Sequence, residues 1–175
     1  NTNSNFLNKL FLEKTKERLE LYCSMNNIKT SDSWSFRGEL ISLDDILRLS
    51  EKYLPKDNSY TTVIHGDFCF SNILYDFRTH RIKVIDPRGL DNDGKVTIFG
   101  DIRYDIAKLS HSIIGMYDWI IAGYYQIKIK ENSIEFNVCQ EQKEIKKLFI
   151  DIIKKEFNLS EANLYAMQIQ LFLSM

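Results

Sequence analysis

Several common signatures are missing from this 175-residue sequence, and each absence narrows the class of protein it can be. Only three cysteines occur, Cys23, Cys69 and Cys139. They form no Cys-x-x-Cys pair, which argues against a zinc site or redox motif and favours free thiols in a reducing compartment. No signal peptide is recognisable, and no apolar run reaches the roughly 20 residues needed to cross a bilayer. We therefore expect a cytoplasmic protein without a membrane span.

The sequence also lacks an excess of charge of either sign. Its 23 basic and 24 acidic residues give a net charge of −1, so a broad electrostatic attraction to nucleic acid or to an anionic membrane is not expected. The 44% of hydrophobic residues and 13% of aromatic residues suffice for the core of one globular domain. A small molecule is the expected partner.

Phosphate-binding loops of the Gly-x-Gly-x-x-Gly or Walker type are absent as well, and no early strand carries an obvious phosphate-pairing lysine. The seven glycines are instead concentrated after residue 60, where Gly66, Gly89, Gly94 and Gly100 fall. Glycine permits sharp turns, which can hold polar groups around a ligand. The chemistry of the chain is therefore expected between residues 61 and 100.

That stretch contains three polar side chains at a spacing that phosphoryl transfer can use. Residues 65–72 read His-Gly-Asp-Phe-Cys-Phe-Ser-Asn, and residues 84–89 read Val-Ile-Asp-Pro-Arg-Gly. Asp67 suits the orientation and deprotonation of an acceptor hydroxyl, whereas Asn72 and Asp86 offer the hard oxygen ligands that Mg²⁺ prefers. The pattern predicts a kinase-like active site.

These residues resemble the catalytic and metal-binding loops of the aminoglycoside phosphotransferase and choline kinase group, small-molecule kinases that share the protein-kinase fold. The first loop there reads His-Gly-Asp-x-x-x-x-Asn, and residues 100–107 are similar to the group's Gly-Asp-x-x-x-Asp-Leu-Ala element. Residues 86–89 and 107–112 more narrowly resemble phosphotransferase-like proteins associated with bacterial capsular polysaccharide synthesis. The resemblance is detailed from about residue 60 to 125.

The resemblance implies an α+β fold, mainly α, that forms the carboxy-terminal lobe of a protein-kinase-like fold. It implies a helical lead-in over 1–60, loops carried by small β-hairpins over 61–100, and helices with a hairpin near 125–138 over 101–175. The implied activity is transfer of phosphate from ATP, with Mg²⁺, to a hydroxyl of a small molecule such as a sugar of surface-polysaccharide metabolism. We expect the nucleotide-binding amino-terminal lobe to be absent from these 175 residues.

Within this reading, Asp67 is the expected catalytic base, and Asn72 and Asp86 are the expected ligands of Mg²⁺ and the bound nucleotide. His65 is expected to brace the loop by packing and hydrogen bonding rather than to transfer protons. Asp105, one turn inside its helix, is expected to reach back to amides of the catalytic loop, with solvent exposure as the alternative.

Arg88 departs from the Phe-Gly or Leu-Gly continuation that is frequent after the metal-binding aspartate in such kinases. A guanidinium group there would suit a phosphorylated or carboxylated acceptor. An ion pair with Asp91, Asp93 or Asp101 is an equally good use of it, so the sequence leaves both open.

Two other functions compete with the kinase reading. A noncatalytic kinase-like module that binds a ligand or a partner enzyme would keep the same scaffold. A metal-dependent hydrolase using His65, Asp67 and Asp86 is weaker, because further ligands at suitable spacing are missing.

Hydrophobic periodicity predicts the following elements. Helices are expected over 6–25, 43–53, 140–157 and 160–175, together with one long helix that begins after Asp101 and continues to about 124. Strands are expected over 61–64, 73–75, 82–85, 96–99, 125–129 and 134–138.

Overall fold

The computed structural model describes residues 7–55, 61–91, 93–138 and 142–175. The chain is a mixed α and β protein in which about half of the residues are helical. Its helical segments are η1 (Asn8–Glu13), α1 (Lys14–Asn26), α2 (Leu43–Tyr53), η2 (Phe70–Asn72), α3 (Ile102–Ile113), α4 (Tyr117–Ile121), α5 (Lys143–Phe157) and α6 (Glu161–Leu173). None of the described helices combines the length and apolar character that crossing a bilayer requires.

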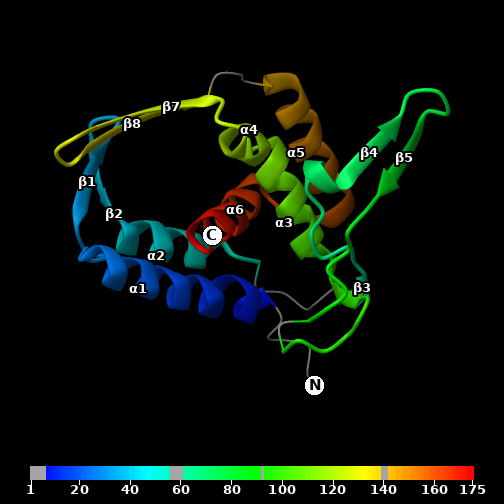
Figure 1. Ribbon diagram of the computed structural model, residues 1–175, viewed down its shortest axis with the longest axis horizontal. Helices are drawn as coiled ribbons and strands as arrows, with labels where there is room; N and C mark the ends of the chain where they lie inside the picture. The colour runs from blue at the N-terminus through cyan, green and yellow to red at the C-terminus, as the bar shows by residue number, and fades with distance from the viewer. Residues whose placement is uncertain (1–6, 56–60, 92, 139–141) are drawn as a thin grey trace.

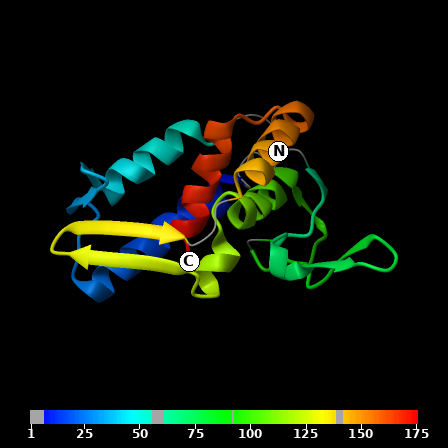
Figure 2. The ribbon, with the colours of Figure 1, turned by 90° about the horizontal axis from the view of Figure 1, so that it is seen from above.

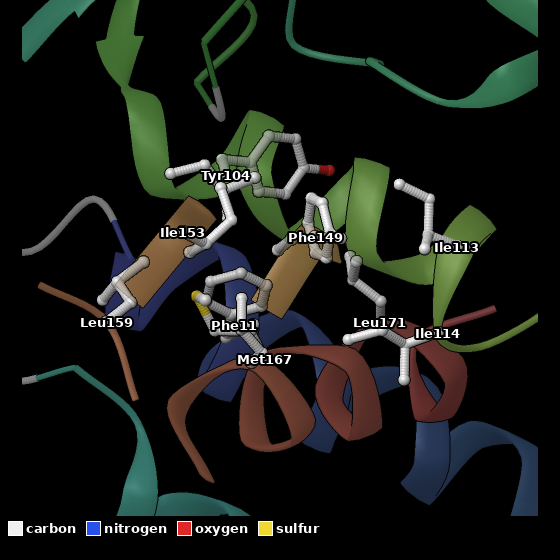
Figure 3. Packing of buried hydrophobic residues seen from close by; sticks show 12 residues of the cluster. Phe11, Tyr104, Ile113, Ile114, Phe149, Ile153, Leu159, Met167 and Leu171 are labelled. Atoms are coloured by element: carbon white, nitrogen blue, oxygen red, sulfur yellow. The ribbon is translucent and has the colours of Figure 1, made fainter. Parts of the chain in front are cut away.

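The hydrophobic core lies between η1, α3, α5 and α6 (Figure 3). Phe11 of η1 is completely buried and packs its ring 5.9 Å from that of Tyr104 in α3. Leu164 and Met167 of α6 and Phe149 of α5 complete the cluster from the other helices. Packing of this kind holds α3 in place, and α3 in turn supports the candidate site.

Two hairpins extend from opposite ends of this helical body (Figures 1 and 2). At one end, β1 (Ser33–Phe36), β2 (Glu39–Ser42), β7 (Tyr125–Lys130) and β8 (Ser133–Val138) form a sheet in the order β2-β1-β8-β7. At the other end, β4 (Ile73–Asp76) pairs antiparallel with β5 (Arg81–Val84). The short strands β3 (Thr61–Val63) and β6 (Phe99–Asp101) pair with each other beside the start of α3.

Most of the expected elements are present near their expected bounds. The structure confirms α2, whose first turn is closed by a capping box in which the Ser42 hydroxyl accepts from the Asp45 amide and Asp45 accepts from the Ser42 amide. The hairpins β4–β5 and β7–β8 are confirmed too. Residue 6, Cys139 and residues 140–141, which the sequence analysis assigned to helices or to a free thiol, lie outside the described residues.

The expectation of a purely helical segment before residue 60 is wrong, because residues 33–42 form β1 and β2. Strand β1 pairs in parallel with β8, where Ser35 lies opposite Ser133. The pairing of β1 with β2 is local, with Phe36 opposite Glu39, whereas the β8 partner is too distant along the chain to leave a local signal. The strand expected over 96–99 is also shifted, since β6 begins at Phe99 and only an isolated bridge joins Val96 to Leu90.

The long helix expected from 101 to about 124 is two helices. Helix α3 ends at Ile113, and Met116 then adopts a left-handed conformation with φ of 56° before α4 begins. Gly115 lies so close to α6 that an added Cβ would come 2.8 Å from a ring carbon of Phe172. The helix is therefore interrupted, between α3 and α4, at the place where α6 approaches it closely.

Candidate active site

The loop before β4 is fastened to α3 by Asp105. Its carboxylate accepts hydrogen bonds from the backbone amides of His65, at 2.7 Å, and Gly66, at 2.8 Å. Asp105 is buried, so solvent exposure, the alternative considered from sequence, is excluded. A charged acceptor for two amides of one turn fixes the conformation of that turn.

His65 braces the loop from its other side. Its Nε2 lies 2.9 Å from the carbonyl oxygen of Ile85, while its Nδ1 lies 3.3 Å from the amide nitrogen of Asp67. A neutral ring that donates from Nε2 and accepts at Nδ1 satisfies both contacts. Both ring nitrogens therefore hold the loop, and neither has a lone pair free for a metal ion. This weakens the alternative of a metal-dependent hydrolase that uses His65 as a ligand.

Asp67 and Asn72 lie against each other within this loop. The side-chain amide of Asn72 donates to the Asp67 backbone carbonyl at 2.9 Å and to the Asp67 carboxylate at 3.2 Å. Asn72 is buried, and its amide nitrogen is used on Asp67, which leaves the carboxamide oxygen as the atom for a further ligand. Asp67 is more open, with 41% of its side-chain surface exposed.

Asp86 reaches the same region through the β4–β5 hairpin. The amide of Ile85 donates to the carbonyl of Asn72 at 3.0 Å, so Asp86 follows directly on the residue bonded to Asn72. Asp86 is exposed and has a left-handed φ of 56°, an uncommon conformation for a residue other than glycine. Strained backbone of this kind is found at functional sites.

The donor set of Asn72 and Asp86 fits Mg²⁺. A carboxylate and a carboxamide oxygen are hard ligands, and Mg²⁺ is commonly held by one or two carboxylates together with substrate phosphates. In the described part of the chain, no group of three or more histidine, cysteine, aspartate or glutamate side chains gathers for a metal. The residues therefore suit a metal shared with a phosphorylated ligand better than a cage made by protein alone.

Arg88 lies next to residues 65 and 66 of the loop. Its amide donates to the His65 carbonyl at 2.9 Å, and an added Cβ on Gly66 would come 2.8 Å from the Arg88 Cβ. Of the acidic partners considered from sequence, Asp101 pairs with Arg103 and Asp93 with Lys9. Arg88 forms no ion pair with any of the described residues.

The sequence analysis missed Lys108, which lies one turn after Asp105 on α3. Its ammonium group lies 2.8 Å from the Asp67 carboxylate. One turn further along, the Ser112 hydroxyl accepts from the Phe70 amide at 3.1 Å. Residues three and four apart share a helix face, so the spacing of Asp105, Lys108 and Ser112 is a signal that could have revealed them.

Burial and neighbouring groups shift the pKa values of two residues of this site, Asp105 and Lys108. Burial raises the pKa of Asp105, against the lowering effect of the amides of His65 and Gly66. Burial also disfavours the charge of Lys108, but Tyr104 and Asp67 outweigh it and raise the pKa of Lys108. Lys108 is thus a stable cation beside Asp67.

Comparison with known proteins gives one structural similarity. No family model and no curated protein matches the sequence. The chain is similar in structure to an aminoglycoside-3'-phosphotransferase of type VIII, with a TM-score of 0.46 and 19% sequence identity. The similarity covers 93% of this chain and 50% of the other, so the chain spans about half the length of that protein. No residue role is transferred from it.

Proposed function

We propose that the chain is the carboxy-terminal, catalytic lobe of a kinase-like phosphotransferase that uses Mg²⁺ and ATP. The observation that carries the proposal is the contact of Asn72 with Asp67 on a loop that Asp105 fastens to α3, with Asp86 next to the residue whose amide bonds to Asn72. Phosphoryl transfer needs mainly positioning and charge stabilisation, and an orienting carboxylate beside two hard oxygen ligands supplies parts of both.

Each residue has a distinct role in this proposal. Asp67 orients the acceptor hydroxyl and takes its proton. Asn72 and Asp86 hold Mg²⁺, which offsets the charge of the nucleotide phosphates when bound. His65 and Asp105 keep the loop in the conformation that aligns these groups.

The acceptor is proposed to be a hydroxyl of a small molecule, a sugar or sugar derivative of surface-polysaccharide metabolism. This part rests on the similarity of residues 86–89 and 107–112 to capsule-associated phosphotransferase-like proteins. A cytoplasmic location would fit the use of ATP.

A second candidate is a noncatalytic kinase-like binding module. The observation in its favour is the ion pair between Lys108 and Asp67, because it occupies the carboxylate that a base would need to keep free. Transfer would require the acceptor to displace or share this contact.

Asp67→Asn separates the two functions. In a protein that includes an amino-terminal lobe, we expect Mg²⁺-dependent transfer from ATP to a panel of sugars to fall about 100-fold or more, the range of a positioned base. ATP binding, measured by calorimetry, should be unchanged. Asp151→Asn, on an exposed position of α5, is the matched control. Equal turnover by wild type and Asp67→Asn would remove Asp67 from the mechanism, and no transfer by wild type would favour the binding module.

The 175-residue chain alone should fold but transfer phosphate very slowly. A nucleotide held from one side would seldom lie in line with the acceptor hydroxyl. Comparing its turnover with that of the longer protein tests this expectation. Saturable, ATP-dependent transfer by the chain alone would contradict it.

A further inference from the structure

Positive charge collects around Asp67 from three separate elements. The first contribution is Lys108 of α3, whose ion pair with Asp67 is half-open to solvent, with 24% of the Lys108 side chain exposed. An ammonium group has three donors, and the contact with Asp67 uses one of them. Lys108 can therefore hold Asp67 and a ligand at the same time.

Arg88 is the second contribution, from the segment after β5. The contact of its Cβ with Gly66, the residue before Asp67, and its amide bond to His65 anchor the base of the side chain beside the loop. Gly66 has a φ of 78°, so the turn itself favours glycine and leaves space for the Arg88 stem. Arg88 is an exposed residue, and its guanidinium forms no ion pair among the described residues, which leaves its planar set of donors available.

Lys14, at the start of α1, is the third contribution. Its pKa is lowered, first by burial and then by the positive charges of Arg18, Arg88 and Lys108, whereas Asp67 acts in the opposite direction. Lys14 therefore lies within the electrostatic reach of the same group. The carboxylates of Asp67 and Asp105, which interact with each other, offset part of this positive charge.

We propose that Lys14, Arg88 and Lys108 form a binding site for the anionic group of the acceptor, which is a hydroxyl compound carrying a phosphate or a carboxylate. This inference rests on the proposed function, since it names the class of acceptor whose hydroxyl Asp67 orients. Arginine and lysine recognise both anions through charge-assisted hydrogen bonds. A cationic acceptor such as an aminosugar would be repelled.

Binding of four probes with one sugar scaffold tests the charge preference without nucleotide or Mg²⁺. The probes are glucose 6-phosphate, glucuronate, glucose and glucosamine, titrated into the 175-residue chain by calorimetry at constant ionic strength. We expect one or both anions to bind at least about tenfold more tightly than glucose, and glucosamine no more tightly than glucose. The stronger of the two anions identifies the group. Equal binding of all four probes, or binding of none, would overturn the proposal.

Variants of Lys108 test whether the proposed residues are responsible. Lys108→Met should weaken the preferred anion about tenfold or more, and Lys108→Arg should restore most of the affinity, because it returns the charge. Lys14→Met should weaken the same probe and provides a second test if Lys108→Met fails to fold. Lys147→Met, on an exposed position of α5, is the control for a change in net charge. Unchanged affinity in folded Lys14→Met and Lys108→Met would refute the site.

The same variants distinguish this site from one for the nucleotide. In the longer protein, loss of ATP affinity in Lys108→Met with unchanged binding of the anionic sugar would assign these cations to the triphosphate and overturn the inference. Absence of transfer in that protein would instead defeat the proposed function, while the sugar titrations would still report on the anion site.

Discussion

Replacing Asp105 with alanine removes two of the acceptors that fasten the loop of residues 65–72 to α3. The amides of His65 and Gly66 would lose their partner, at 2.7 and 2.8 Å, and Gly66 is buried. A buried donor left without a partner costs about 1–3 kcal/mol. The His65 position is half-buried, so water can offset part of its loss, and burial of the carboxylate is itself unfavourable. We therefore expect Asp105→Ala to lower the free energy of unfolding by about 1–3 kcal/mol.

Thermal unfolding and amide hydrogen exchange measure the two consequences of this change. For a chain of this size, 1 kcal/mol corresponds to roughly 2–4 °C, so the expected fall in Tm is about 2–12 °C. Exchange at the His65 and Gly66 amides should accelerate more than exchange in α5. Asp105→Asn, which keeps one acceptor oxygen, should have a smaller effect, and Asp151→Ala on an exposed position of α5 is the control. An unchanged Tm together with unchanged exchange at both amides would refute the role of Asp105.

Two further predictions concern the metal and the dependence on pH. Asp86→Ala should weaken binding of Mg-nucleotide to the longer protein more than Asn72→Ala, because it removes a charged rather than a neutral ligand; equal affinities of wild type and both variants in calorimetry would contradict the assignment. Burial and the nearby charge of Lys108 lower the pKa of His111 to about 4, from 6.5, so between these pH values the unfolded chain binds a proton that the folded chain does not. The free energy of unfolding should therefore fall as the pH decreases through this window, by up to about 3 kcal/mol. Denaturant unfolding at several pH values should show a flatter dependence of this free energy on pH for His111→Phe than for wild type. Parallel dependences for the two proteins would exclude His111 as the cause.

Local sequence determined the elements whose signals lie within a few residues. Helix α2 begins where expected because Ser42 and Asp45 close its first turn by themselves. The β4–β5 hairpin, with Ile73 opposite Val84, follows from two short β-forming runs that meet across one turn. The same locality made Asp67, Asn72 and Asp86 recognisable as a group, since their spacing alone carries the pattern.

Tertiary structure alone decided the features that depend on distant segments. Strand β1 pairs locally with β2, but its parallel pairing with β8, in which Ser35 lies opposite Ser133, joins segments far apart in the sequence. The end of α3 coincides with the approach of α6 at Gly115. Helical periodicity could place Lys108 on the face of Asp105, but only the packing of α3 against the loop brings its ammonium group to Asp67. The charge around the candidate base, which decides what it can bind, is therefore a property of the fold, because its cations come from segments that only folding brings together.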